Sequence, residues 1–431
     1  MYFFSRRFFP FFNTLFWGAF NDNVFRYALC IMITYQCSYS AETASGLTFL
    51  AVALLMLPYF PFSALAGEIA DKFCQKKLFF CIKLAEVILM ALTIVAFFFQ
   101  SVPLLLVLLC FMGMKSAFYS PVKYSYIARN TPDELIRGNA YMNAGTNIAI
   151  LLGQVIGIFL IQLNHGPVIT GAGLLLFAIV GFCAAQKIPD RASADPGLKL
   201  NINIIRGTWN VLKILFSDTT ILHCVIGLSL YWMTGALYIS QLSGFVRNVL
   251  GGTEGTVILF TVLFSVGVAL GSCVCSLCNR HFNIVKGICP ALVIMGLFTL
   301  DLYFSAKQWS VPGGDGGLLT ISDFLKEGIF YRMCADLAFL AVCGGFYSVI
   351  LNSLLQITSK PQEIARVIAA NNIVNSFFIV VGAVVAGALV SRCIVTIEGV
   401  FALIAVLNFL IAVYLFPLCR KAWFPLAKEK E

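Results

Sequence analysis

Long apolar runs recur along the whole chain, and short polar segments separate them. A run of about 20 apolar residues is long enough for an α-helix to cross the hydrocarbon core of a bilayer. We therefore predict an all-α membrane protein with twelve transmembrane helices. Their expected positions are residues 11–36, 46–70, 78–100, 102–122, 139–163, 167–187, 219–245, 255–278, 284–305, 330–357, 367–391 and 394–418.

The composition supports the same fold class. Of the 431 residues, 60% are hydrophobic and 11% are charged, whereas a soluble chain has roughly 25% charged residues. So few charges cannot cover a water-facing surface. The 15 cysteines fall mostly within apolar runs, where thiols behave as small hydrophobic groups. Cys275, Cys278 and His281 have ligand-like spacing but lie at a helix end, so we expect neither a metal site nor a cofactor.

The placement of the Lys and Arg residues predicts the orientation in the membrane. An even number of spans puts both termini on one side, and that side then carries 21 of the 29 Lys and Arg residues. Loops rich in Lys and Arg stay in the cytoplasm, so we predict that both termini are cytoplasmic. This topology also explains the net charge of +9 without a nucleic-acid partner.

A polar segment and an internal repeat divide the chain into two halves. Residues 188–212 predict a cytoplasmic linker between six-helix halves at 1–187 and 213–431. TPDELIRGNAYMNAGTNIAILLGQVIG in the first half aligns without a gap with KPQEIARVIAANNIVNSFFIVVGAVVAG in the second, with eight identities that include Pro, Arg and Asn. The fifth and eleventh spans are therefore equivalent, and the halves run in the same orientation. Parallel six-helix halves are the architecture of major facilitator transporters.

The loop between the second and third predicted spans reads GEIADKFCQKK. It resembles the loop signature of the major facilitator superfamily, in which a Gly, an apolar-Ala-Asp-basic run and a closing basic pair recur. The resemblance implies that Asp71 and the start of the eleventh span, near Arg366, form a cytoplasmic latch when the cavity faces outward. Gly67, Lys72 and Arg137 complete the expected gating residues. The alternative interpretation is that these are ordinary solvated loop charges.

Several stretches resemble a narrower family. GAFNDNVFRYAL, IKLAEVILM, SPVKYSYI, IRGNAYMNAGTNIAILLG, LFSVGVALGS and ARVIAANNIVNSFFIV together resemble the lysophospholipid transporter family over most of the chain. The resemblance implies a carrier that flips lysophospholipid from the outer to the inner leaflet of the bacterial cytoplasmic membrane, where an acyltransferase restores the second acyl chain. None of the three histidines has an Asp five residues later, the spacing of an acyltransferase motif. We therefore expect no enzyme activity in this chain and a functional link to a separate acyltransferase.

Two other functions fit the same fold. A drug or small-metabolite exporter would move a soluble compound and would ignore lysophospholipid. A non-transporting membrane scaffold would bind a partner and move no lipid.

Charged and polar residues lie within several predicted spans, although a charge at the bilayer centre costs at least about 2.5 kcal/mol. Asp22 and Arg26 are four residues apart, so they share one helix face and we expect them to pair. Such residues favour a water-filled cavity that binds a lipid headgroup. The predicted substrate-binding residues are Asp22, Arg26, Lys83, Glu86, Lys115, Tyr119, Lys123, Asn143, Asn147, Asn372 and Asn375.

Each of these groups also has a purely structural interpretation. The first acid–base pair can clamp helices together, and Lys83 with Glu86 can support the neighbouring loop. Asparagines in membrane helices frequently join helices to one another. Lys115 and Lys123, on one stripe of the fourth span, are the stronger phosphate candidates. The alternative for Lys123, at a helix end, is that its side chain snorkels to the membrane interface.

Overall fold

The structure is a computed structural model. It describes residues 3–33, 37, 47, 50–51, 54–130, 134–190, 193, 195–200, 203–278, 283–310, 318–391 and 395–423. Within these residues the chain is helical, and the β-structure amounts to an isolated bridge between Gly252 and Leu319. The all-α prediction is confirmed.

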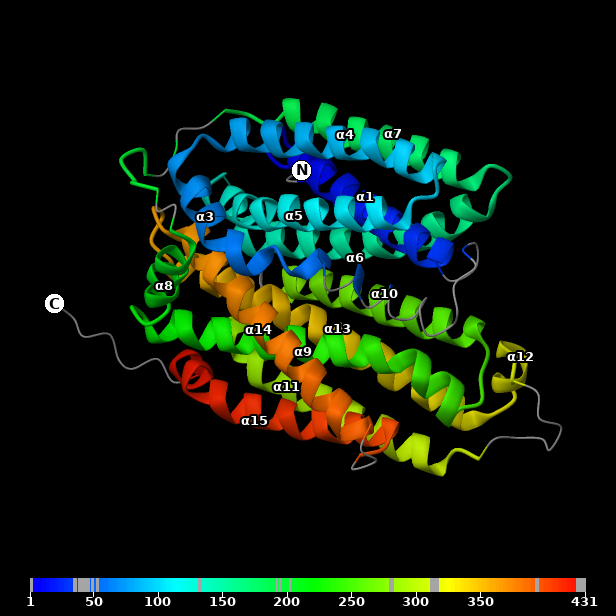
Figure 1. Cartoon of the computed structure of the whole chain (residues 1–431). Helices are drawn as coiled ribbons and strands as arrows, with labels where there is room; N and C mark the ends of the chain where they lie inside the picture. Colours follow the sequence, from blue (N-terminus) through cyan, green and yellow to red (C-terminus); the bar gives the residue numbers. More distant parts are fainter. Residues whose placement is uncertain are drawn as a thin grey trace. The chain divides into compact units, whose positions relative to one another are not determined.

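The helices follow the predicted spans in order (Figure 1). The helices before the linker are α1 (Phe9–Ile31), α3 (Tyr59–Lys72), α4 (Gln75–Phe98), α5 (Val102–Asn130), α6 (Leu135–Gln162) and α7 (Gly166–Gln186). The linker contains α8 (Ile204–Ile214). The long helices after it are α9 (Thr219–Gly244), α10 (Glu254–Cys278), α11 (Ile288–Gln308), α13 (Gly328–Thr358), α14 (Ile364–Ser391) and α15 (Ile397–Trp423). Shorter segments are η3 (Phe245–Val249), η4 (Ile284–Gly287) and α12 (Ile321–Phe324).

In the described part of the chain, ten helices are long and apolar enough to cross a membrane. The other two predicted spans correspond to α1 and α3. α1 is less apolar because its 23 residues include Asp22 and Arg26. α3 has 14 residues, and part of the predicted span before it lies outside the described residues. Large apolar side chains such as Phe98 and Val413 point outward, as expected for a multi-pass membrane protein.

One predicted boundary is wrong, and the error affects the site. α5 continues to Asn130, whereas the predicted fourth span ends at 122. Pro121 lies inside this helix and does not end it. Arg129 therefore projects from a helix and not from a loop, and Lys123 lies within the helix and not at its end. The hydropathy window loses its signal where polar residues begin.

The predicted linker contains a helix that the sequence analysis missed. α8 begins after Asn203, whose side chain accepts a hydrogen bond of 3.0 Å from the backbone N–H of Arg206. An asparagine in this position stabilises a helix start by satisfying one of its free N–H groups. With 11 residues, α8 is too short to cross a bilayer.

Contacts along the chain group it into two compact units. Unit 1 comprises Met1–Gly138, Gly145–Ile221 and Gln356–Ser376, and unit 2 comprises Asn139–Ala144, Leu222–Leu355 and Phe377–Glu431. The start of α14 therefore groups with unit 1, and a short piece of α6 groups with unit 2. The predicted limits of the two halves, at residues 187 and 213, stay a prediction.

Unit 1 is held together by apolar packing between its helices. α7 lies against α1 and α4, while α5 lies against α3 and α4; Figure 1 shows α4 and α7 side by side. Buried side chains such as Phe25 and Phe97 fill the space between them. α6 approaches α1 closely at Gly153, where an added Cβ would lie 2.5 Å from the carbonyl oxygen of Phe20. Small residues allow such close helix contacts in membranes.

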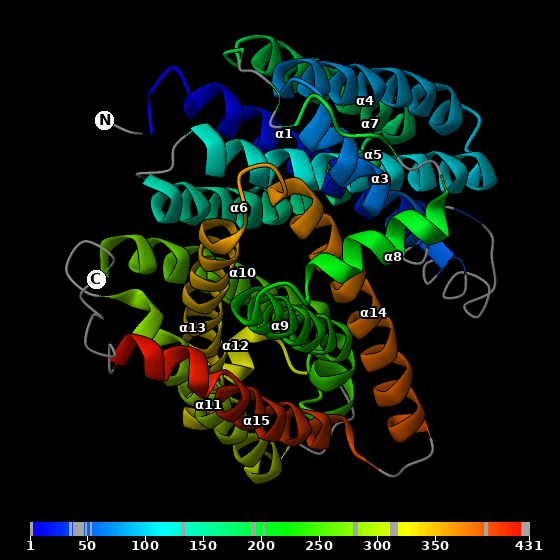
Figure 2. The same ribbon diagram turned by 90° about the vertical axis from the view of Figure 1, so that its left-hand side faces the viewer.

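Unit 2 is also held together by apolar packing and by close helix contacts at glycines. α11 packs along α15, as Figure 2 shows, and aromatic side chains including Phe260 and Phe330 are buried in its core. α10 and α13 approach each other at glycines: an added Cβ at Gly345 would lie 2.1 Å from the carbonyl oxygen of Val268. The close backbone approach therefore requires glycine at that position.

Candidate functional site

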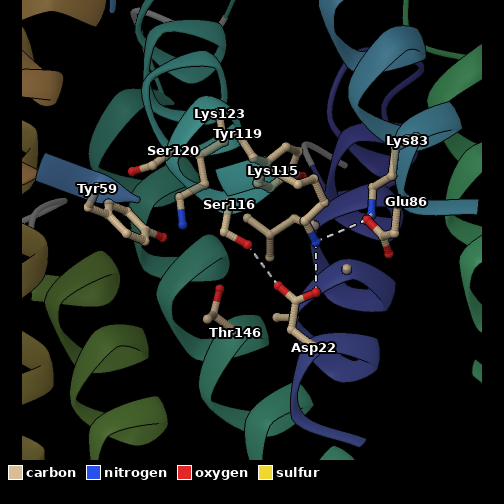
Figure 3. Close-up of a pocket in the computed structure, with 13 residues that line it drawn as sticks. Asp22, Tyr59, Lys83, Glu86, Lys115, Ser116, Tyr119, Ser120, Lys123 and Thr146 are labelled. Atoms are coloured by element: carbon tan, nitrogen blue, oxygen red, sulfur yellow. Dashed lines mark hydrogen bonds and ion pairs between the residues drawn. The ribbon is translucent and has the colours of Figure 1, made fainter. Parts of the chain in front are cut away.

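A polar cavity of about 150 Å³ lies within unit 1 (Figure 3). Side chains from α1, α3, α4, α5 and α6 line it. The lining residues are Leu15, Gly18, Ala19, Asp22, Tyr59, Lys83, Glu86, Lys115, Ser116, Tyr119, Ser120, Lys123 and Thr146. Of the eleven predicted substrate-binding residues, six are in this set: Asp22, Lys83, Glu86, Lys115, Tyr119 and Lys123.

Four of the lining residues form a continuous chain of ion pairs. Lys115 Nζ lies 2.7 Å from Asp22 Oδ1 and 3.3 Å from Glu86 Oε2. Glu86 Oε2 also accepts a bond of 2.9 Å from Lys83 Nζ. Figure 3 shows Lys115 between the two acids. The Lys83 and Glu86 side chains are each 1% exposed, whereas Asp22 is 25% exposed.

The expected pairing of Asp22 with Arg26 is wrong. Asp22 binds Lys115 through one oxygen and Ser116 Oγ, at 3.1 Å, through the other. Arg26 instead lies over the ring of Tyr27, 4.8 Å from its centroid, and is absent from the cavity lining. The spacing of four residues puts both charges near one another on α1, but α5 supplies a closer and more buried cation.

Lys83 and Glu86 belong to the cavity, so the interpretation as loop support is not needed. Gly18 on α1 provides the space for Lys83, because an added Cβ at Gly18 would lie 2.6 Å from Lys83 Nζ. The ammonium also lies 5.6 Å from the centroid of the Tyr119 ring, on its face. Asn21 Nδ2 is 3.4 Å from the other oxygen of Glu86. Several helices thus hold this charged pair in position.

Lys123 gives the cavity an excess of positive charge. The lining contains three lysines and two carboxylates. Lys83 and Lys115 pair with the two acids, whereas Lys123 has no ion pair among the described residues and lies 5.1 Å from the Tyr124 ring. An additional cation in a polar cavity favours an anionic group such as a phosphate.

The predicted asparagines lie outside the cavity lining. Asn143 donates hydrogen bonds to Ser272 Oγ at 2.7 Å and to Ser348 Oγ at 3.0 Å, which joins α6 to α10 and α13 within unit 2. Asn372 donates to Ser120 Oγ at 2.9 Å, so it contacts a lining residue from α14. These bonds fit the interpretation that asparagines join helices. Asn147 and Asn375 are also outside the lining residues.

A second charged cluster surrounds Asp71 at the end of α3. Its carboxylate is completely buried and pairs with Arg129 of α5 and with Arg366 Nε of α14, the latter at 3.2 Å. The same carboxylate accepts the backbone N–H groups of Ala365 and Arg366, each at 3.3 Å. These groups belong to the first turn of α14, where free N–H groups and the helix dipole favour an anion.

The remaining predicted gating residues differ in their contacts. Gly67 lies against α14: an added Cβ would be 2.8 Å from Ala369 Cβ. Arg137, the repeat partner of Arg366, pairs with Glu134 at 3.3 Å and not with Asp71 in the described residues. Lys72 Nζ lies 5.8 Å from the centroid of the Phe73 ring.

Sequence reasoning missed several site residues. Tyr59 and Thr146 line the cavity, and Arg129 contacts Asp71. Tyr and Thr are common in membrane helices, so Tyr59 and Thr146 do not stand out in the sequence. Arg129 falls between the predicted spans 102–122 and 139–163, where a basic residue is ordinary. Of the weak metal-ligand pattern, Cys275 and Cys278 lie in α10, whereas His281 lies outside the described residues.

Comparison with known proteins identifies a family and several similar sequences. The sequence profile of the Major Facilitator Superfamily matches residues 9–309. The chain is 27% identical over 354 residues to the lysophospholipid transporter LplT of Yersinia enterocolitica. The aligned region covers 80% of this chain and 77% of that protein. The chain is also 27% identical over 359 residues to LplT of Escherichia fergusonii, with coverage of 80% and 79%.

Solved structures agree on the fold. A bacterial homologue of the iron transporter ferroportin, in an outward-facing state, matches with a TM-score of 0.67 at 13% identity over 95% of this chain and 99% of that one. The transporter FucP in its outward conformation matches with a TM-score of 0.69 at 14% identity, over 94% and 97%. At such identities the likeness concerns the fold alone.

Proposed function

The chain belongs to the Major Facilitator Superfamily, and from this premise we propose that it carries lysophospholipid from the outer to the inner leaflet of the bacterial cytoplasmic membrane. The transporters LplT, similar over 80% of the chain, support this substrate class. The chain then acts as a carrier without a catalytic step of its own. A separate acyltransferase would restore the second acyl chain after transfer.

The observation that carries the proposal is the charge arrangement of the cavity. Lys123 provides a cation without an ion-pair partner in the described part of the chain, and a lysophospholipid has a phosphate that such a cation can bind. Asp22 is the more exposed of the two acids, at 25%, and can bind an ammonium group in the headgroup. The two fully paired residues, Lys83 and Glu86, then position the exposed charges.

The cavity volume agrees with a headgroup. A cavity of 150 Å³ holds about six non-hydrogen atoms, the size of benzene, and a phosphate group has five. The cavity of about 150 Å³ therefore fits the phosphate region of the substrate, and the acyl chain must extend beyond it. Apolar helix surfaces or lipid must cover this tail, because exposing it to water would cost about 0.8 kcal/mol for each CH₂ group.

The cluster around Asp71 supports a gating role for this end of α3. Asp71 connects α3 to α5 and to the first turn of α14 through one carboxylate. Breaking these bonds would free α14 from α3, and making them would hold the two helices together. We infer that Asp71, Gly67 and Arg366 form the cytoplasmic latch, whereas the contacts of Lys72 and Arg137 give them a smaller part.

Reconstituted transport tests the proposal. Purified protein in proteoliposomes should move labelled lysophospholipid between leaflets, and Lys123→Gln should lower the rate at least about tenfold, because a hydrogen bond to a charged group contributes about 1.5–3 kcal/mol. Lys326→Gln is the matched control, since this exposed lysine lies just after α12 and pairs with Asp323. Flux of a soluble compound without lysophospholipid flux would instead support an exporter, and full flux in Lys123→Gln would contradict the phosphate assignment.

A further inference from the structure

α8 in the linker exposes a row of large apolar side chains. Ile205 is 84% exposed and Trp209 is 61% exposed, and Phe216, just beyond the helix end, is 74% exposed. With 3.6 residues in each turn, Ile205 and Trp209 lie about 40° apart around the helix axis, and Phe216 follows in the turn after the helix end. A continuous apolar stripe is therefore left uncovered by the described residues.

A different face of α8 attaches it to the protein. Val211 and Leu215 are buried, and α8 packs against α3 within unit 1. Figure 2 shows α8 lying beside α3. The exposed stripe is therefore not the surface that holds the helix in place, and its apolar character needs another explanation.

Positive charge lies next to the stripe. Arg206 and Lys213 are both exposed, and Lys213 Nζ lies 5.7 Å from the centroid of the Trp209 ring. The helix sequence IIRGTWNVLKI contains no acidic residue. Apolar side chains flanked by basic ones are the pattern of helices that lie at a membrane surface, with Trp at the level of the headgroups.

The chain geometry keeps α8 close to the bilayer. α8 ends at Ile214, and the membrane-spanning part of α9 begins at Thr219. Five residue steps reach at most about 18 Å when fully extended, and Phe216 lies within this connection. The helix end therefore cannot move far from the membrane, so a lipid surface is the partner within reach.

We propose that α8 is an interfacial helix that inserts Ile205, Trp209 and Phe216 into the adjacent leaflet and binds anionic phospholipid headgroups through Arg206 and Lys213. The inference goes beyond the proposed transport function and does not need it. A soluble protein that covers the same stripe is the competing outcome of the test.

Fluorescence of Trp209 tests the insertion in the full-length protein. The signal of Trp209 is the difference between the wild type and Trp209→Phe, both reconstituted in phosphatidylcholine and phosphatidylglycerol nanodiscs. We expect lipids with a nitroxide near the headgroup to quench this signal at least twofold and aqueous iodide to leave it nearly unchanged. Quenching by iodide without quenching by the lipid nitroxide would place Trp209 in water and overturn the proposal.

A charge variant tests the binding of anionic lipid. The measured quantity is the ratio of Trp209 quenched by the lipid nitroxide to Trp209 quenched by iodide. In wild-type protein, replacing half of the phosphatidylcholine by phosphatidylglycerol should raise this ratio roughly thirtyfold. Each of the two basic residues contributes roughly fivefold, since each gains about 1 kcal/mol near an anionic surface. Arg206→Gln with Lys213→Gln should remove this dependence, and so should high salt. Lys326→Gln, just after α12, should keep this dependence. An unchanged dependence in the double variant would overturn the assignment to Arg206 and Lys213, and neither measurement uses lysophospholipid.

Discussion

At the residue scale, the central feature is that Lys115 compensates two acids from different helices. Removing one partner of a buried ion pair costs about 3–5 kcal/mol, because a charge stays buried without compensation. Asp22 and Glu86 would both lose their contact with Lys115. The stability of the site therefore depends on this lysine more than on any charge of α1 alone.

We predict that Lys115→Gln lowers the free energy of unfolding by about 3 kcal/mol. The double variant Asp22→Asn with Lys115→Gln should recover part of the loss, since one unpaired acid is then removed. Arg26→Gln is the matched control and should change stability by less than about 1 kcal/mol, because Arg26 contacts the Tyr27 ring. Thermal unfolding of the purified variants measures all three. An Arg26→Gln variant as unstable as Lys115→Gln would restore the pair within α1.

The sequence predicted which charged residues line the cavity better than it predicted which of them form ion pairs with one another. Spacing within one helix can be read from the chain, and Lys83 and Glu86, three residues apart, do pair. The same reasoning fails for Asp22 and Arg26, because Asp22 pairs with Lys115 of another helix. Asp22 and Lys115 are separated by 93 residues, and which helices face each other depends on packing that no local pattern records. For the same reason, polarity alone put Asn143 in the cavity, whereas it joins helices of unit 2.

At the element scale, the contact between α3 and α14 depends on the absence of a side chain at Gly67. Gly67→Ala should separate the two helices, because the new Cβ would lie 2.8 Å from Ala369 Cβ and 3.0 Å from the Ala365 carbonyl oxygen. Gly235→Ala in α9 meets no atom within 4 Å and should be neutral or stabilising by up to about 1 kcal/mol. Thermal unfolding measures the stability of both variants. Equal unfolding temperatures for Gly67→Ala and Gly235→Ala would show that the contact between α3 and α14 is not tight.

The latch itself can be followed through the amides that it binds. In Asp71→Asn, the N–H groups of Ala365 and Arg366 lose a charged acceptor. We expect their hydrogen exchange to become about tenfold faster, which corresponds to about 1.4 kcal/mol of lost stabilisation. Peptides from α11, which lies in the other compact unit, serve as the control. Unchanged exchange at the start of α14 would leave Asp71 without a part in holding it.

At the scale of the whole molecule, hydropathy was sufficient for the order and approximate limits of the helices. The repeated apolar runs correspond to the long helices of the structure. The pattern failed where polarity and helicity coexist: α5 extends past Lys123, and α8 lies in a segment read as linker. Membrane windows detect continuous apolar segments of about 20 residues. The polar end of α5 and the 11 residues of α8 do not form such segments.

The proposed orientation predicts a labelling pattern. Ser193 lies in the linker and Ser310 follows α11, so cysteines introduced at these positions should lie on opposite sides of the membrane. A membrane-impermeant maleimide added to intact cells should label Ser310→Cys and miss Ser193→Cys until the cells are opened. The unsubstituted chain gives the background from its own cysteines. The reverse pattern would place the termini outside.

The ion pair between Asp22 and Lys115 also has a consequence for biogenesis. α1 is not apolar enough to be counted among the ten membrane-spanning helices of the described residues, and the cation that compensates Asp22 is 93 residues further along the chain. At 5–20 residues per second, a ribosome needs roughly 5–19 s to synthesise that interval. During this time the first helix reaches the translocon without its partner. Stable integration of α1 must therefore wait for α5, and a chain truncated before Lys115 should release its first helix from the membrane more readily than a longer chain does.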